Sequence, residues 1–123
     1  MNYYRMKLET VPFGEPGQML KYADLLVLLL QSAIPGKGIK RKEMKLRIRM
    51  QHRILQDDAD GEEYTHFTEQ GYKLLKILGD NYLWGTAQEQ FDTFLDCLNA
   101  CEMVDREEIP EVITAHAVEL VTG

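Results

Sequence analysis

Apolar residues in the first part of the chain follow two different spacings. In NYYRMKLETVPF, residues 2–13, Tyr, Val and Phe partly alternate with polar residues, which favours a short strand. The turn-forming stretch GEPG follows at residues 14–17. From Gln18 to Ser32 good helix formers continue without a breaker, and five leucines between positions 25 and 30 cover most of the helix circumference. We therefore expect a central buried helix that ends before Pro35.

The next segment, GKGIKRKEMKLRIRMQHR at residues 36–53, carries two signals that disagree. Apolar positions 44, 46, 48 and 50 alternate with basic positions 45, 47 and 49, and this period of two is typical of a strand with a basic outer face. The residue types instead favour a helix, because Lys, Glu, Met, Leu, Arg and Gln are helix formers and the segment continues without a break to Leu55. We predict a helix, with the strand as the alternative.

The second half of the chain predicts a loop, a strand and two helices. The polar stretch QDDADGEE, residues 56–63, reads as a loop, and Tyr64–Phe67 reads as a short strand. Thr68 is a suitable N-cap for a helix that Gly79 would end. Thr86 can cap a further helix over residues 87–103, where apolar residues recur at helical spacing. The last segment, VDREEIPEVITAHAVELVTG, is left open as a helix, an edge strand or a tail that orders on a partner.

These elements predict a mainly α fold: a compact bundle of about four helices with one or two short peripheral strands. We expect three parts, namely an N-terminal arm or strand at residues 1–17, a helical core domain at 18–102 and a C-terminal tail at 103–123. A chain of 123 residues is long enough for one domain with a modest core.

Charge is distributed unevenly along this acidic chain. The net charge is −6, yet residues 36–53 hold eight of the fourteen Lys and Arg residues and one acid, Glu43. After residue 53, sixteen acidic residues stand against three basic ones. Such an asymmetry indicates either an interaction surface or neutralisation of the basic block by the acidic half within one fold.

No motif of high specificity points to catalysis. The three histidines, His52, His66 and His116, lie on different predicted elements and have no metal-ligand spacing. The cysteines, Cys97 and Cys101, are one helical turn apart and are read as reduced packing thiols. We therefore expect no enzymatic activity, no metal and no cofactor.

The start of the chain lacks an apolar run and the longest apolar stretch is Leu25–Leu30, so we expect a soluble intracellular protein.

Nucleic-acid binding is the alternative function. The basic block could place Lys40, Arg41, Lys45, Arg47 and Arg49 along a phosphate backbone. The stretch YTHFTEQGYKLLKIL also resembles the wing-to-helix passage of winged-helix regulators. That fold needs a three-helix unit and a two-stranded wing, of which only one strand is evident here, and the acidic DDADGEE would occupy the wing tip and repel DNA.

A broader resemblance covers roughly residues 20–100. A leucine-rich helix, IPGKGIKRKEMKLRIRMQHRILQ, an acidic turn and FTEQGYKLLKILGDNYLWGTAQEQFDTFLDCL follow each other in the order seen in small accessory proteins of tailed bacteriophages and prophages. The similar parts include Gly38-Ile39 before Glu43-Met44, the Tyr72–Leu75 helix, and Trp84-Gly85 before the last apolar helix. The resemblance implies a phage or prophage context and binding to a host or virion component. No site residues are carried over from it.

We therefore expect a non-enzymatic accessory or adaptor protein that acts by protein–protein contact, in the cytoplasm of a bacterial host cell or associated with a virion. The expected partner is a protein, either a second copy in a homo-oligomer or a host or virion component, with DNA as the alternative. Arginine and aromatic residues often anchor interfaces. The residues expected to bind the partner are Lys40, Arg41, Lys45, Arg47, Arg49, Arg53 and Trp84.

Overall fold

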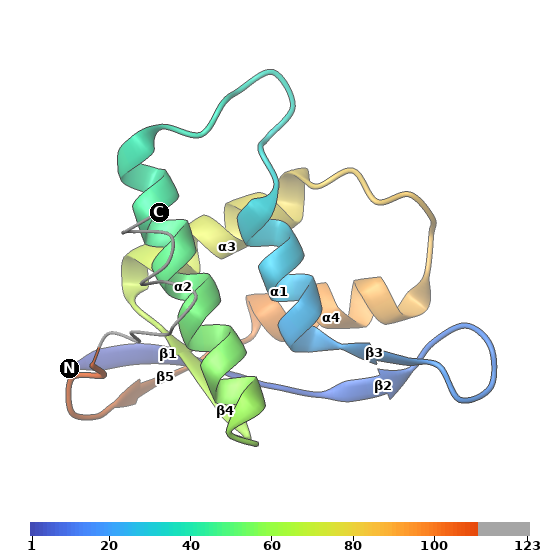
Figure 1. Cartoon of the computed structure of the whole chain (residues 1–123), viewed down its shortest axis with the longest axis horizontal. Helices are drawn as coiled ribbons and strands as arrows, with labels where there is room; N and C mark the ends of the chain where they lie inside the picture. Colours follow the sequence, from blue (N-terminus) through green and yellow to red (C-terminus); the bar gives the residue numbers. More distant parts are fainter. Residues whose placement is uncertain (111–123) are drawn as a thin grey trace, which may run out of the picture.

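The computed structural model of the protein describes residues 1–110. Within these residues the chain forms, in order, β1 (Asn2–Lys7), β2 (Thr10–Pro12), β3 (Met19–Lys21), α1 (Tyr22–Gln31), α2 (Arg41–Ala59), β4 (Tyr64–Phe67), α3 (Glu69–Asn81), α4 (Glu89–Asn99) and β5 (Glu102–Asp105). Figure 1 shows α1, α2 and α3 above the strands in this view, with the β2–β3 hairpin extending away from the N-terminus.

The fold is a mixture of helices and sheets, so the prediction of a mainly helical bundle was wrong. Helices make up 48% of the described residues and strands 18%, in two small antiparallel sheets. One sheet has the order β4-β1-β5, and the other is the β2–β3 hairpin. The first strand is central, because Arg5 lies opposite both His66 of β4 and Glu102 of β5. Its partners are some 60 and 100 residues further along the chain, which is why its neighbourhood is hard to infer from local sequence.

Helix α1 is the central helix of the core, as its leucine content predicted. Leu25, Leu26, Leu29 and Leu30 are buried, and α1 packs against both α2 and α3. The helix begins at Tyr22 and not at Gln18, because Met19–Lys21 pair with β2. The ring of Tyr22 meets Phe94 of α4 edge to face at a centroid distance of 5.2 Å. Buried apolar side chains from the four helices, β1 and β4 form one continuous core.

The basic segment is a helix, which confirms the preferred interpretation. Helix α2 also continues through residues 56–59, where a loop was expected. The extension has a physical cause, since Asp57 is buried and finds polar partners. Its Oδ2 accepts a hydrogen bond of 2.8 Å from the fully buried Thr65 hydroxyl, and its Oδ1 lies 3.5 Å from Arg53 Nη1. These contacts connect the end of α2 to β4 and offset the burial of a carboxylate.

The observed caps and ends of α3 and α4 agree only in part with those predicted from the sequence. Thr68 caps α3 as predicted, because its Oγ1 accepts a hydrogen bond of 3.1 Å from the Gly71 amide. Helix α3 continues through Gly79, where α4 passes so closely that an added Cβ would lie 3.0 Å from Leu95 Cδ2. Helix α4 begins at Glu89, after the non-capping Gln88 and not at Thr86, and ends at Asn99.

The three predicted parts of the chain contribute to shared structure. Residues 2–7 form the centre of the three-stranded sheet, and residues 102–105 form one of its edges. The N-terminal ammonium lies 2.9 Å from Asp105 Oδ1, which joins the two ends of the described chain. The tail segment therefore includes an edge strand up to Asp105, whereas the prediction for residues 111–123 lies outside the described residues.

Candidate protein-binding surface on helix α2

Arg47 is not on the exposed surface of α2, which corrects its assignment as a partner-binding residue. Only 3% of it is exposed. Its Nη1 donates hydrogen bonds to the Leu30 carbonyl at 3.3 Å and the Ser32 carbonyl at 2.7 Å, at the end of α1. Its Nε and Nη2 donate to Glu43 Oε2 at 3.1 and 2.8 Å. Arg47 thus satisfies carbonyl groups that have no partner within α1, and this is a structural role.

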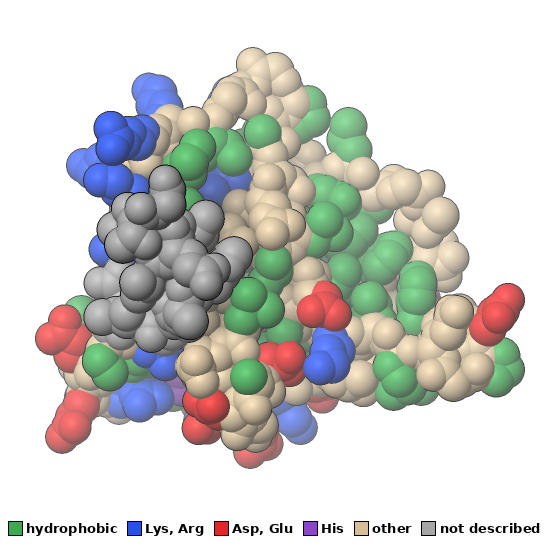
Figure 2. Space-filling view, in the orientation of Figure 1, with side chains coloured by type: hydrophobic (Ala, Val, Ile, Leu, Met, Phe, Trp, Pro, Cys, Tyr) green, Lys and Arg blue, Asp and Glu red, His purple; other side chains and the backbone are tan. Residues whose placement is uncertain are grey.

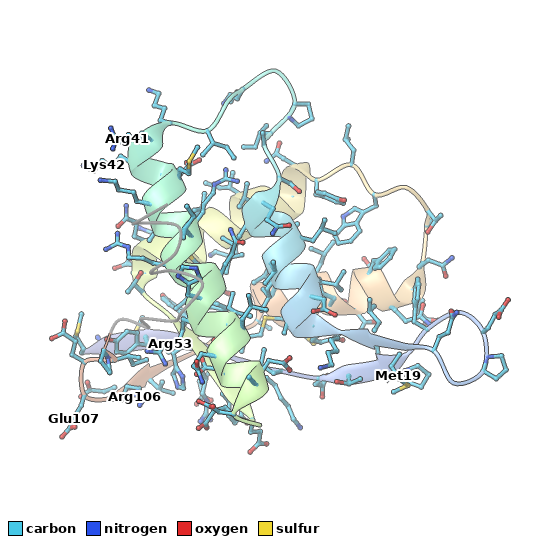
Figure 3. The ribbon with its side chains drawn as sticks, in the orientation of Figure 1. Met19, Arg41, Lys42, Arg53, Arg106 and Glu107 are labelled. Atoms are coloured by element: carbon cyan, nitrogen blue, oxygen red, sulfur yellow. The ribbon has the colours of Figure 1, made fainter. Side chains whose placement is uncertain are left out.

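Three of the other predicted cations lie on the solvent side of α2. Arg41, Lys45 and Arg49 are exposed, and none of them forms an ion pair with an acidic residue in the part of the chain that the structure describes. Figure 2 shows Lys and Arg gathered over the first turns of α2, and Figure 3 shows Arg41 and Lys42 pointing away from the protein there.

Exposed apolar side chains lie beside these cations. Met44 and Leu55 are 45% and 46% exposed, and Ile48 is at 36%. At 100° per residue these three positions fall within about 40° of one another on the helix surface, next to Arg41 and Lys45. We define the outer face of α2 as Arg41, Met44, Lys45, Ile48, Arg49 and Leu55. None of its apolar residues was among those expected from the sequence to bind a partner.

The start of α2 violates the usual electrostatic pattern of helices. Lys40 occupies the N-cap position without a side-chain cap, and Arg41 and Lys42 follow, whereas Glu43 is the acidic residue of the first turn. Cations are unfavourable at a helix N-terminus, because the macrodipole is already positive there. The helix end therefore presents a strong positive potential toward solvent.

A groove lies beside this end of the helix, between α2 and α3. Its volume is about 950 Å³, and it is open to solvent. Leu46, Leu74 and Ile77 supply apolar surface, and lysines line it at several points. The lysines are Lys37, Lys40, Lys42 and Lys73. Of these, Lys73 also pairs with Glu69 across one helical turn at 3.3 Å.

Arg53 and Trp84, which were also predicted to bind the partner, lie away from the outer face of α2. Arg53 lies near the end of α2, where it pairs with Asp57 and donates through Nη2 to the Pro110 carbonyl. Trp84 lies on the connection between α3 and α4, where it stacks on Phe91 at 4.6 Å between centroids and meets Tyr82 at 4.7 Å. Its Nε1 is buried without a partner among the described residues. The structure therefore does not bring Trp84 to the outer face of α2.

Among residues 1–110, the side chains that could support chemistry lie apart from one another. Within residues 1–110 no three His, Cys, Asp or Glu side chains lie close enough together to hold a metal ion. Cys97 and Cys101 are free, and burial raises the pKa of the Cys101 thiol to about 11. Burial, together with the nearby Arg106 guanidinium, lowers the pKa of His66. A thiol of raised pKa is a poor nucleophile.

Comparison with protein-family models, with curated proteins and with solved structures returned no match. Among the described helices, none combines the length and the apolar character that a membrane crossing needs.

Proposed function

We propose that this protein is a non-enzymatic accessory or adaptor protein that binds a protein partner through the outer face of α2. The partner would present acidic groups together with apolar side chains. A component of a phage-infected or lysogenic bacterial cell, or of the virion, fits the resemblance noted in the sequence. Self-association is the version of this proposal in which the acidic partner is a second copy.

The observation that carries the proposal is the combination of cations and apolar side chains on one exposed helix face. Cations at the start of α2 oppose the helix dipole, and apolar residues beside them remain in water. Neither feature stabilises the fold. Features that lower stability without a local benefit are expected where a surface serves binding. Methionine and arginine are enriched at protein interfaces, whose rim is polar.

Two observations favour a protein over nucleic acid. Binding to phosphates needs cations, whereas Met44, Ile48 and Leu55 would gain little from contact with a phosphate backbone. The winged-helix alternative also needs a two-stranded wing, while β4 pairs with β1 at the start of the chain. DNA binding remains the alternative, so the experiment must also be able to detect it.

The test compares capture of partners by the immobilised full chain and by three charge or polarity variants, using nuclease-treated bacterial extract. Lys45→Glu/Arg49→Glu reverses two cations of the outer face, and Ile48→Ser removes an apolar contact on the same face. Lys7→Glu/Lys21→Glu is the control, because it changes the net charge equally on exposed residues of β1 and β3. We expect a partner that binds the wild type and the control, and binds both α2 variants at least tenfold more weakly.

The captured partner is then purified, and binding is repeated with the two pure proteins. Sedimentation of the pure wild type, alone and with a random-sequence duplex at low and moderate salt, detects the other outcomes. Loss of DNA binding in Lys45→Glu/Arg49→Glu, with full binding in Ile48→Ser and a steep decrease with salt, would establish a phosphate-binding surface instead. Equal partner capture by all variants would refute the assignment of this face.

A further inference from the structure

An apolar hollow lies beside the start of α4, away from α2. Its volume is about 640 Å³. Trp84 of the α3–α4 connection lines it together with Phe91 and Leu95 of α4, and all three side chains are half-buried. Figure 2 shows hydrophobic side chains at the surface between α1 and this connection. We call this site the α4 hollow; it shares no residue with the outer face of α2.

Acidic side chains border the α4 hollow. Glu89 and Asp92 line it, and Asp96 lies about one turn further along α4. At 100° per residue these three positions fall within about 60° of one another on the helix, and Leu95 and Phe91 follow next around it. All three acids are exposed, and none pairs with a Lys or Arg among the described residues. The hollow therefore combines apolar surface with negative charge that the described fold does not neutralise.

The outer face of α2 has the opposite charge beside its own apolar side chains. Arg41 and Lys45 are exposed there without an ion pair among the described residues, and Met44 and Ile48 lie next to them in water. Opposite charges on two surfaces steer their encounter and fix their orientation, and removal of apolar side chains from water adds affinity. The α4 hollow and the outer face of α2 thus complement each other in charge and in apolar character.

The two complementary surfaces lie apart on one chain. Figure 1 shows α2 on one side of α1 and the α3–α4 connection, which leads into α4, on the other. A contact between them therefore requires a second copy. A contact between two different patches is heterologous, so it repeats from copy to copy and closes into a ring or continues as an open chain.

We propose that the α4 hollow binds the outer face of α2 of a second copy of this chain. Apolar side chains of α2 pack against Trp84 and Phe91 of the other copy, and the cations of α2 approach its Asp92 and Asp96. This inference rests on the proposed function, because it names the partner of the same α2 face.

Sedimentation of the purified full chain over a range of concentrations at low salt measures the association. Asp92→Lys/Asp96→Lys reverses the acidic surface, and Arg41→Glu/Lys45→Glu reverses the basic one. Each variant alone carries like charges on both surfaces, so we expect its dissociation constant to rise at least tenfold. Circular dichroism checks that each variant keeps its helices.

The control variant is Glu62→Lys/Glu107→Lys. It changes the net charge as much as the α4 variant does, at exposed acids that form no ion pair among the described residues. Figure 3 shows Glu107 near the end of the described chain, on the far side of the protein from α4's first turns. We expect this control to associate within threefold of the wild type.

A mixture of the two reversed variants is the sharpest measurement. In the mixture the basic α2 of one variant meets the acidic α4 of the other, and the acidic α2 meets the basic α4. We expect association within threefold of the wild type, although neither variant associates alone. The net charge of −6 becomes −2 in one variant and −10 in the other, so both stay negative and overall attraction does not explain their association.

Trp84 reports on the hollow directly, because it is the single tryptophan of the sequence. We expect acrylamide to quench its fluorescence at least twofold less in the associated wild type than in the dilute chain. The inference is overturned by a chain that stays monomeric at every concentration, by equal association of the α4 variant and the control, by a mixture that does not associate, or by unchanged quenching of Trp84. A monomer that still captures a partner from bacterial extract through the α2 face would overturn this inference alone and leave the proposed function standing.

Discussion

Replacement of Arg47 by methionine isolates the structural role of this one residue within the basic block. Methionine keeps an apolar stem of similar length, but it leaves the carbonyls of Leu30 and Ser32 without their donor. An unsatisfied buried polar group costs about 1–3 kcal/mol. Glu43 is 40% exposed at its side chain, so water can replace the guanidinium there at little cost. The free energy of unfolding should therefore fall by about 3 kcal/mol.

Urea denaturation followed by circular dichroism at 222 nm measures this loss. With a slope of about 1.5 kcal/mol per molar urea, the midpoint should fall by about 2 M. Arg49→Met is the matched control, because it removes the same side chain two residues further along the same helix from an exposed position. It should change the free energy of unfolding by less than about 0.5 kcal/mol. Equal midpoints for the two variants would refute the assignment of Arg47 to the fold.

Three further changes probe the core and its thiols. Gly79→Val should destabilise the protein by about 2 kcal/mol through overpacking against Leu95, whereas Gly85→Val, at an open position, should have little effect in the same denaturation assay. A double-mutant cycle of Asp57→Ala and Thr65→Val should give a coupling energy of about 1.5 kcal/mol, and a value near zero would contradict a direct buried hydrogen bond. Because its pKa is raised from 9.0 to about 11, Cys101 should react with iodoacetamide at pH 8 about a hundredfold more slowly than in the urea-unfolded chain; equal rates would exclude this shift.

The elements that were predictable are those with strong local signals. Helix α1 is evident from its leucines, α2 from its helix-forming residues, and the start of α3 from its threonine cap. The fold class was not predictable in the same way. The strands are three to six residues long, and β1 becomes central only because β4 and β5 return to it from far along the chain. Short strands with distant partners leave no local pattern that distinguishes them from a peripheral arm.

Within α2, the sequence alone also does not show that Arg47 is buried while Arg49 is exposed. Arg47 and Arg49 occupy equivalent positions in the alternating pattern, yet they end on opposite sides of α2. Helical spacing offers one usable signal, because Glu43 and Arg47 are four residues apart and Arg47 shares a face with Ile54. What no spacing reveals is that the end of α1 brings two carbonyl groups to this face. Their position depends on how α1 and α2 pack together.

The basic block therefore divides into groups with different physical explanations. Arg47 is buried and caps α1, and Arg53 pairs with Asp57 and contacts Pro110, so the fold itself accounts for both. No such account exists for Lys40, Arg41 and Lys42, which weaken the start of α2 by a few tenths of a kcal/mol each. Had these residues served only to neutralise the acidic half of the chain, they would gain most from pairing with it. The ion pairs of the described residues instead join acids to Lys7, Lys21, Lys73 and other cations outside this group. The positive end of α2 is thus available to an acidic binding partner, and this availability supports the proposed partner surface.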